Sequence, residues 1–231
     1  MYIYGYDPTY FLMVIACIVA LVAQLKVKST FARYSKERSR TGLTGAEVAE
    51  RILHSQGVYD VAIHPVKGEL TDHYNPSNKT VNLSEAVYSS TSVAALGVAA
   101  HECGHAIQHA QGYAPLRFRS ALAPVASIGS KLSWFFIIAG LFFSASHTLI
   151  TVGIFMFSLA VLFQVVTLPV EFNASSRAVA LLAQNGILYD DEIRGTKKVL
   201  GAAALTYVAA AATAIIQLIR LIIIFGGRDR D

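Results

Sequence analysis

Residues Ala94–Tyr113 read AALGVAAHECGHAIQHAQGY, and they contain an HExxH pattern at positions 101–105. The residues before this pattern are mostly apolar and include no proline, so the stretch is predicted to form a helix. His101 and His105 are four residues apart, which places them one turn apart on the same face of that helix. Their ring nitrogens could therefore bind one zinc ion, and Glu102 could act as a general base toward water.

A zinc site of this kind needs a third protein ligand. His109 continues the spacing of four, but it lies about 12 Å from His101 along the helix axis, since each residue adds ~1.5 Å. One ion cannot reach both rings, so His109 is expected to support the site and not to bind the metal. The alternative is a surface helix with two solvated histidines. The apolar flanks disfavour it, because burying unpartnered imidazoles is costly.

The composition is that of a membrane protein. The chain has 231 residues, of which 54% are hydrophobic and 15% charged, and its mean hydropathy is +0.49. The hydrophobic fraction is higher and the charged fraction lower than in ordinary soluble domains. Cys17 and Cys103 offer no disulfide framework. The net charge of +4 would suit nucleic acid, but the basic residues follow the membrane topology and no binding module is visible. No nucleic-acid partner is therefore expected.

Four apolar runs are long enough to be predicted as transmembrane helices: 10–25, 132–145, 148–168 and 202–225. The second and third form a hairpin with a turn near residues 144–148. The first has no basic residue before it, so it is interpreted as an uncleaved anchor. Sixteen of the nineteen Lys and Arg residues precede the fourth run, in segments that the positive-inside rule assigns to the cytoplasm. Both termini are then expected outside, although Arg228 and Arg230 in the C-terminal tail weakly oppose this.

Residues 41–90 have the features of a small soluble α+β unit. Thr44 and Glu47 match a helix capping box, and Gly57 is expected to end that helix. Residues 59–63 alternate as in a strand that Pro65 would end, and residues 80–83 suggest a second strand. Ser84 is expected to cap a helix that leads into the HExxH helix.

Glu171 is the predicted third ligand. It is the only carboxylate between Glu102 and Asp190, and it follows the transmembrane hairpin on the same side of the membrane as the HExxH helix. The alternative is an interfacial carboxylate paired with Arg177. The HExxH pattern favours the ligand role.

The sequence resembles the YugP-type neutral zinc metallopeptidases, which are small integral membrane proteins of bacteria. The resemblance covers nearly the whole chain, and it is more distant to the HtpX-type and CAAX prenyl proteases. It rests on four stretches: LTDHYNP (70–76), VNLS (81–84), SVAALGVAAHECGHAIQHA (92–110) and PVEFNASSRA (169–178).

The resemblance implies that His101, His105 and Glu171 bind zinc and that Glu102 is the catalytic base. Two positions depart from the pattern. Ser175 stands where the wider group often has an aspartate that orients a zinc-binding histidine, and Asn173 stands where this type usually has an aspartate. A weaker metal affinity is therefore expected.

The predicted fold class is a mainly α integral membrane protein with four transmembrane helices and a small cytoplasmic α+β zincin-like metallopeptidase unit. Five consecutive segments are expected. They are an anchor (1–25), the zincin-like unit with the HExxH helix (26–120), a transmembrane hairpin (121–168), a cytoplasmic segment with the third ligand (169–201), and the fourth transmembrane helix with a short tail (202–231).

The predicted function is zinc-dependent hydrolysis of peptide bonds in membrane or membrane-proximal proteins, on the cytoplasmic side of the plasma membrane. The partners expected are a polypeptide substrate and the bilayer; a second copy or a membrane-protein partner is open. Residues 67–74 could form an edge strand that pairs with substrate. The residues expected to support the ligands or contact substrate are His73, Tyr74, His109, Asn173 and Arg177. Two alternatives remain: a catalytically weak zinc-binding scaffold or chaperone-like partner, and a zinc hydrolase of a lipid-linked substrate.

Overall fold

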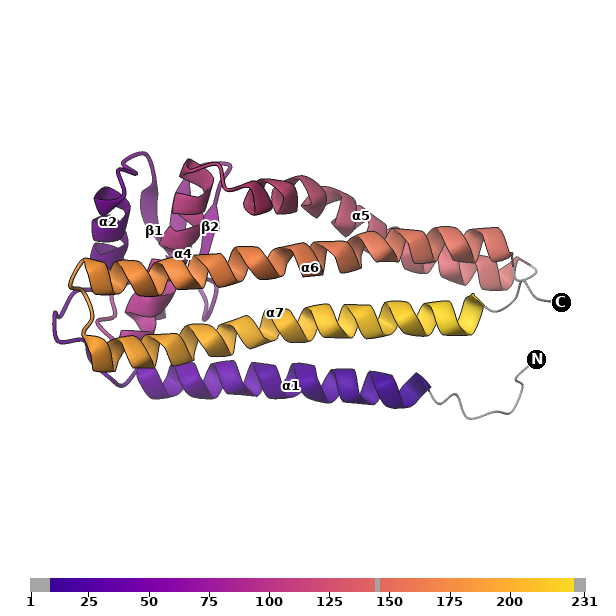
Figure 1. Ribbon diagram of the computed structural model, residues 1–231, viewed down its shortest axis with the longest axis horizontal. Coiled ribbons are helices and arrows are strands. Elements are labelled where there is room, and N and C mark those ends of the chain that lie inside the picture. Colours follow the sequence, from indigo (N-terminus) through magenta and orange to yellow (C-terminus); the bar gives the residue numbers. More distant parts are fainter. Residues whose placement is uncertain (1–8, 144–145, 227–231) are drawn as a thin grey trace. The chain divides into compact units, whose positions relative to one another are not determined.

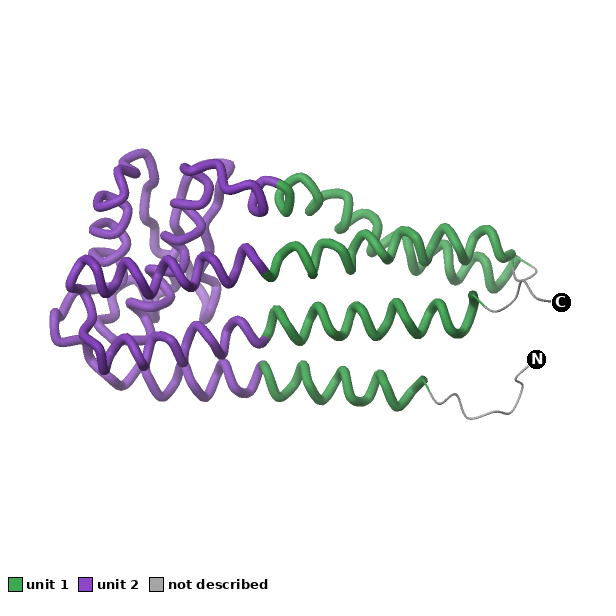
Figure 2. The backbone as a smooth tube through the Cα atoms, in the orientation of Figure 1, with its two compact units in different colours: residues 1–23, 118–168, 206–231 green, residues 24–117, 169–205 purple. Residues whose placement is uncertain are grey.

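The computed structural model describes residues 9–143 and 146–226 (Figure 1). The chain divides into two compact units (Figure 2). As far as they are described, residues up to 23, 118–168 and from 206 onward form what we call the helical unit. Residues 24–117 and 169–205 form what we call the mixed unit. Each unit is therefore assembled from segments that are distant in sequence.

Four helices are long and apolar enough to cross a membrane: α1 (Thr9–Tyr34), α5 (Ala114–Phe142), α6 (His147–Gln184) and α7 (Asp190–Phe225). In the helical unit, large apolar side chains are exposed along them, including Phe142 at 83% and Phe155 at 65%. Such surfaces suit contact with lipid. The prediction of a mainly α membrane protein with four spanning helices is confirmed. The predicted hairpin turn includes Ser144 and Ala145, and the C-terminal tail includes Arg228 and Arg230; these four lie outside the described residues.

The spanning helices are longer than the apolar runs that predicted them. α1 continues past Leu25 to Tyr34, so much of the basic segment is helical. α7 begins at Asp190, well before the apolar run, with three acidic residues in its first turn. Acidic groups at a helix N-terminus interact favourably with the helix dipole, which explains the earlier start.

Helix α2 (Gly45–Ser55) belongs to the mixed unit. Its predicted capping box is present, because the Thr44 side chain accepts from the Glu47 amide and the Glu47 carboxylate accepts from the Thr44 amide. Its apolar residues Val48, Ile52 and Leu53 are fully buried in a core shared with α4 (Val93–Ala110). This core fixes α4, which carries the HExxH residues.

A three-stranded sheet lies beside these helices. Its strands are β1 (Ala62–Val66), β2 (His73–Asn75) and β3 (Thr80–Ser84), in the order β1-β3-β2. β1 is parallel to β3, and β2 is antiparallel to it. The first strand was expected to end at Pro65, but Pro65 lies inside β1. Proline is tolerated there because β1 is an edge strand, where a missing N–H donor need not disrupt the ladder.

The segment before α4 also differs from expectation. Ser84 precedes only the four-residue α3 (Glu85–Tyr88), and its side chain makes no capping hydrogen bond. Instead, Ser84 donates its amide to the Asp72 carboxylate, which joins the end of β3 to the residue before β2. α4 has its own cap, since Ser92 accepts from the Ala95 amide.

Candidate metal centre

His101 and His105 come from the middle of α4, and Glu171 comes from α6. A close approach between these helices brings them together at Gly104, inside the HExxH pattern. A Cβ atom at Gly104 would lie 2.8 Å from the carbonyl oxygen of Ala174, closer than real Cβ atoms are found. Any larger residue would therefore push α6 away. The glycine therefore lets α6 pack close to α4 at Ala174. Glu171 precedes Ala174 along α6, and Ser175 follows it directly.

The three predicted ligand side chains converge. The Nε2 atom of His101 is 3.3 Å and that of His105 is 3.6 Å from the same Glu171 carboxylate oxygen, Oε2. The three donor atoms lie within 4.8 Å of one another, and the two rings meet edge to face. Tetrahedral ligands about 2.1 Å from a zinc ion would lie about 3.4 Å apart. The observed spacing therefore fits a zinc ion.

Both histidines are oriented through their other ring nitrogen. His101 Nδ1 is 3.1 Å from the Ser175 hydroxyl, and His105 Nδ1 is 3.1 Å from the Gln108 amide oxygen. The Gln108 amide nitrogen donates to the Val170 carbonyl at 2.9 Å and to Asn173 at 3.0 Å. This leaves only its oxygen for His105, so the proton of that ring belongs on Nδ1 and the Nε2 lone pair faces Glu171. Two lone pairs this close require a cation between them, either a proton or a metal ion.

The electrostatics of the mixed unit agree with a cation site. Burial on its own lowers the pKa of His105, but hydrogen bonding to Glu171 and the charges of Glu102 and Glu171 outweigh it, so the pKa is raised overall. Glu102 itself is buried, with 8% of its surface exposed. Positive charge is therefore favoured between these side chains.

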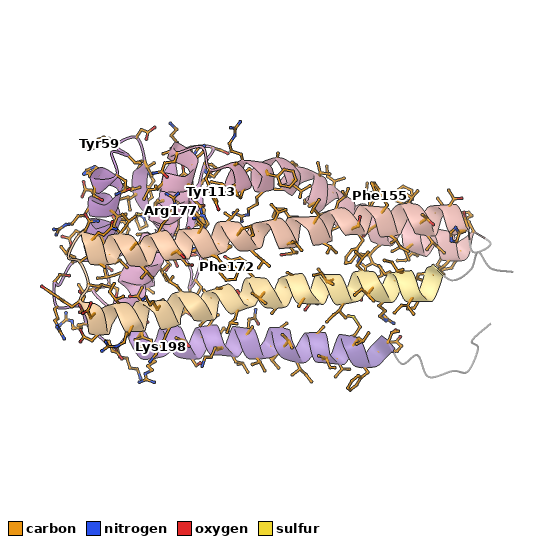
Figure 3. All side chains as sticks on the ribbon, in the orientation of Figure 1. Tyr59, Tyr113, Phe155, Phe172, Arg177 and Lys198 are labelled. Carbon is orange, nitrogen blue, oxygen red and sulfur yellow. The ribbon has the colours of Figure 1, made fainter. Side chains whose placement is uncertain are left out.

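Arg177 and Asn173 extend the hydrogen bonds outward. The Arg177 Nε donates to Asn173 Oδ1 at 2.8 Å, and a guanidinium NH₂ group donates to Gln111 Oε1 at 2.6 Å. The guanidinium lies 5.9 Å from the Tyr113 ring centroid (Figure 3). Asn173 thus accepts from both Arg177 and Gln108. A continuous chain of hydrogen bonds runs from Arg177 through Asn173 and Gln108 to His105.

The other predicted candidates lie elsewhere in the mixed unit. The Tyr74 hydroxyl is 2.7 Å from His109 Nδ1, and both line a cavity of about 290 Å³ with Asp60 and Lys79. His73 is exposed on β2, with its Nδ1 2.8 Å from the Thr71 carbonyl. Neither His73 nor His109 belongs to the group of three donors found among the described residues.

Gln108 was missed by the sequence reasoning. It is fully buried and touches one ligand and two residues of α6. One signal was available, because Gln108 follows His105 by three residues and therefore lies on the same face of the helix. Ser175 was noted only as a departure from a pattern, yet its hydroxyl lies where an orienting group is needed.

Comparisons with known proteins identify the family of this chain. Residues 9–226 match the family described as "Putative neutral zinc metallopeptidase". The chain is 47% identical over 222 residues to the "Putative membrane protease YugP" of Bacillus subtilis (strain 168), and the match covers 96% of this chain and 98% of that protein. No solved structure matches. Because the family match spans almost the entire chain, the protein belongs to this zinc metallopeptidase family.

Proposed function

We propose that His101, His105 and Glu171 together bind one zinc ion. The observation that carries the proposal is the convergence of two ring nitrogens and one carboxylate oxygen within 4.8 Å. Two imidazoles and a carboxylate form a donor set typical of catalytic zinc, which keeps a further position for water or substrate. Hydrogen bonds to Ser175 and Gln108 hold the rings in the orientation that such binding needs.

We further propose that the protein hydrolyses peptide bonds. Zinc, when bound, would supply Lewis acidity that activates water and polarises the substrate carbonyl. Glu102 follows His101 directly and is buried beside the site. Its carboxylate would accept the proton of the attacking water and pass it to the leaving amine nitrogen. The guanidinium of Arg177 and the His109–Tyr74 pair are candidates for contacting the substrate.

The proposed substrate is an extended polypeptide in or near the membrane. β2 lies at the edge of the sheet and packs against α4, so its outer edge can pair with a substrate backbone. The expected edge segment began at Lys67, but only His73–Asn75 is strand. The relative in Bacillus subtilis is named a membrane protease, which agrees with this class of substrate.

The proposed location is the plasma membrane, with the site on the cytoplasmic side. The support is the bias of basic residues, since sixteen of nineteen precede the fourth apolar run in segments assigned inside.

Elemental analysis and a protease assay on wild type and four variants test these roles. Wild type and Glu102→Gln should each retain about one zinc ion per chain, as expected for one site with three protein ligands. Glu171→Ala should lose the zinc. With fluorescein-labelled casein as the probe, Glu102→Gln should cleave at least about a hundredfold more slowly. The exposed residue Glu50 provides matched controls, Glu50→Gln and Glu50→Ala, which should behave as wild type.

The ligand role of Glu171 and the general-base role of Glu102 can each be refuted without the other. Zinc retained by Glu171→Ala would refute the ligand assignment. Unchanged cleavage by Glu102→Gln would refute the general base. Zinc-loaded wild type that cleaves neither casein nor a detergent-solubilised membrane protein would favour the scaffold alternative over hydrolysis.

A further inference from the structure

A groove in the mixed unit lies between the C-terminal part of α1 and the N-terminal part of α7. Its volume is about 620 Å³. We call it the basic groove, and it is lined by Lys26, Ser29, Thr30, Arg33, Tyr34, Lys198, Gly201, Ala202 and Leu205. None of these residues belongs to the candidate metal centre.

The charged side chains that line the basic groove are all cationic. Lys26, Arg33 and Lys198 all line it and are exposed, and the lining includes no acidic residue. Within the described part of the chain, no carboxylate forms an ion pair with any of the three. By contrast, Arg40 and Lys79 in the same unit pair with Asp191 and Asp60. Three uncompensated cations around one concave surface favour an anion.

Packing explains why the groove is open. Gly195 of α7 lies against Tyr34, where an added Cβ would be 2.8 Å from the ring, so the two helices are tightly packed there. At Gly201, almost two turns further along α7, an added Cβ would meet nothing within 4 Å. The Arg33 guanidinium lies 5.6 Å from the Tyr34 ring centroid, which holds it beside the groove. The glycine thus leaves space where the cations gather.

The position of the groove in the sequence points to a lipid. Lys26 is the first charged residue after the apolar run of α1, and Lys198 is the last before the apolar run of α7. Both mark the level at which a spanning helix meets the headgroups. Ala202 and Leu205 add apolar surface, and Ser29 and Thr30 add hydroxyl groups. The groove thereby offers cations and hydroxyl donors to a phosphate group, and apolar surface to a hydrocarbon chain.

We propose that the basic groove binds the phosphate headgroup of an anionic phospholipid, such as phosphatidylglycerol. Lys26, Arg33 and Lys198 would contact the phosphodiester, as in other basic pockets between transmembrane helices. Leu205 would contact the start of an acyl chain. The site is independent of hydrolysis, so the Glu102→Gln protein should bind the lipid as wild type does.

Native mass spectrometry of the full chain in detergent, with dioleoyl phosphatidylglycerol or dioleoyl phosphatidylcholine added, tests this proposal. Wild type should retain phosphatidylglycerol in preference. Lys26→Gln combined with Lys198→Gln should weaken retention roughly thirtyfold, given the usual contribution of two basic residues. Lys28→Gln combined with Lys197→Gln is the matched control, because both lysines are exposed, neither lines the groove, and the charge change is the same. This control should change retention less than about threefold, since surface charge acts weakly at a distance.

A third variant separates the shape of the groove from its charge. Gly201→Leu fills the open space without changing any charge, and it should also weaken retention of phosphatidylglycerol. Equal losses in the two lysine pairs would mean diffuse surface attraction and would overturn the proposal. So would equal retention of phosphatidylcholine, or unchanged binding by Gly201→Leu. If millimolar inorganic phosphate displaced the lipid completely, the site would be one for free phosphate and the lipid assignment would be wrong.

Discussion

Replacing Gln108 with methionine should weaken zinc binding without removing any ligand. Methionine has a similar length and volume, so the buried space stays filled. It can neither accept the proton of His105 Nδ1 in a normal hydrogen bond nor donate to Val170 and Asn173. All three contacts of the wild-type amide, at 3.1, 2.9 and 3.0 Å, are lost. Only the supporting side chain changes.

The size of the loss in zinc affinity follows from the hydrogen bonds that each partner of Gln108 retains. Val170 is inside a helix, so its carbonyl keeps its intrahelical donor, and Asn173 keeps the bond from Arg177. The Nδ1–H group of His105 is left buried without its acceptor, which costs about 1–3 kcal/mol. Since 1.4 kcal/mol is a factor of ten, zinc affinity should fall about ten- to a hundredfold, as for other partners of metal-binding histidines.

Competition with a chromophoric zinc chelator measures this affinity without a protease substrate. Gln111→Met is the control, because Gln111 is exposed at the end of α4 and contacts only Arg177 among the hydrogen-bonded groups described above. Gln108→Glu keeps an acceptor for His105 and should lose less affinity than Gln108→Met. Unchanged affinity in Gln108→Met, or an equal loss in Gln111→Met, would refute the orienting role.

Three further predictions concern the mixed unit. Gly104→Ala should weaken zinc binding by chelator competition, because its Cβ would lie 2.8 Å from the Ala174 carbonyl oxygen, whereas Gly201→Ala has open space and should raise the unfolding temperature. Cys103 should resist iodoacetamide at pH 8 until the protein is unfolded in SDS, because burial raises the pKa of its thiol, whereas Cys17 is exposed; rapid labelling at Cys103 in the folded protein, located by peptide mass spectrometry, would contradict this. Burial also raises the pKa of Asp72 above 3.8, so its stabilising contribution is present below that value and is lost as pH rises through the folded-state pKa. As the pH is raised from 3 to 7, the unfolding temperature of wild type should therefore fall relative to that of Asp72→Asn.

The sequence was informative wherever a local pattern determines the structure. The spacing of His101 and His105, the capping box at Thr44 and the apolar runs each depend on neighbouring residues, and each appears in the structure as expected. Glu171 was reached by elimination and by topology, and the structure brings it to the histidines. Few candidates had to be weighed, because a hydrophobic run offers few carboxylates.

Contacts between distant segments could not be predicted in this way. Gln108 acts through Val170 and Asn173, more than sixty residues away, and no local pattern specifies that register. The Tyr74–His109 pair depends likewise on how β2 packs against α4. Pro65 was misinterpreted for a related reason, since whether it ends a strand depends on that strand's place in the sheet.

Asn173 illustrates what the hydrogen-bond chain changes in the sequence argument. Asparagine in place of the usual aspartate was expected to weaken metal binding, because it carries no charge. The oxygen of Asn173 accepts from both Gln108 and Arg177, so the acceptor that fixes Gln108 is still provided. What the asparagine omits is the negative charge, not the orientation of His105. The Arg177 charge then lies at the outer end of the chain without a carboxylate between it and the ligand. Any lower metal affinity must therefore be electrostatic in origin, and it should diminish as salt screens the partly exposed guanidinium.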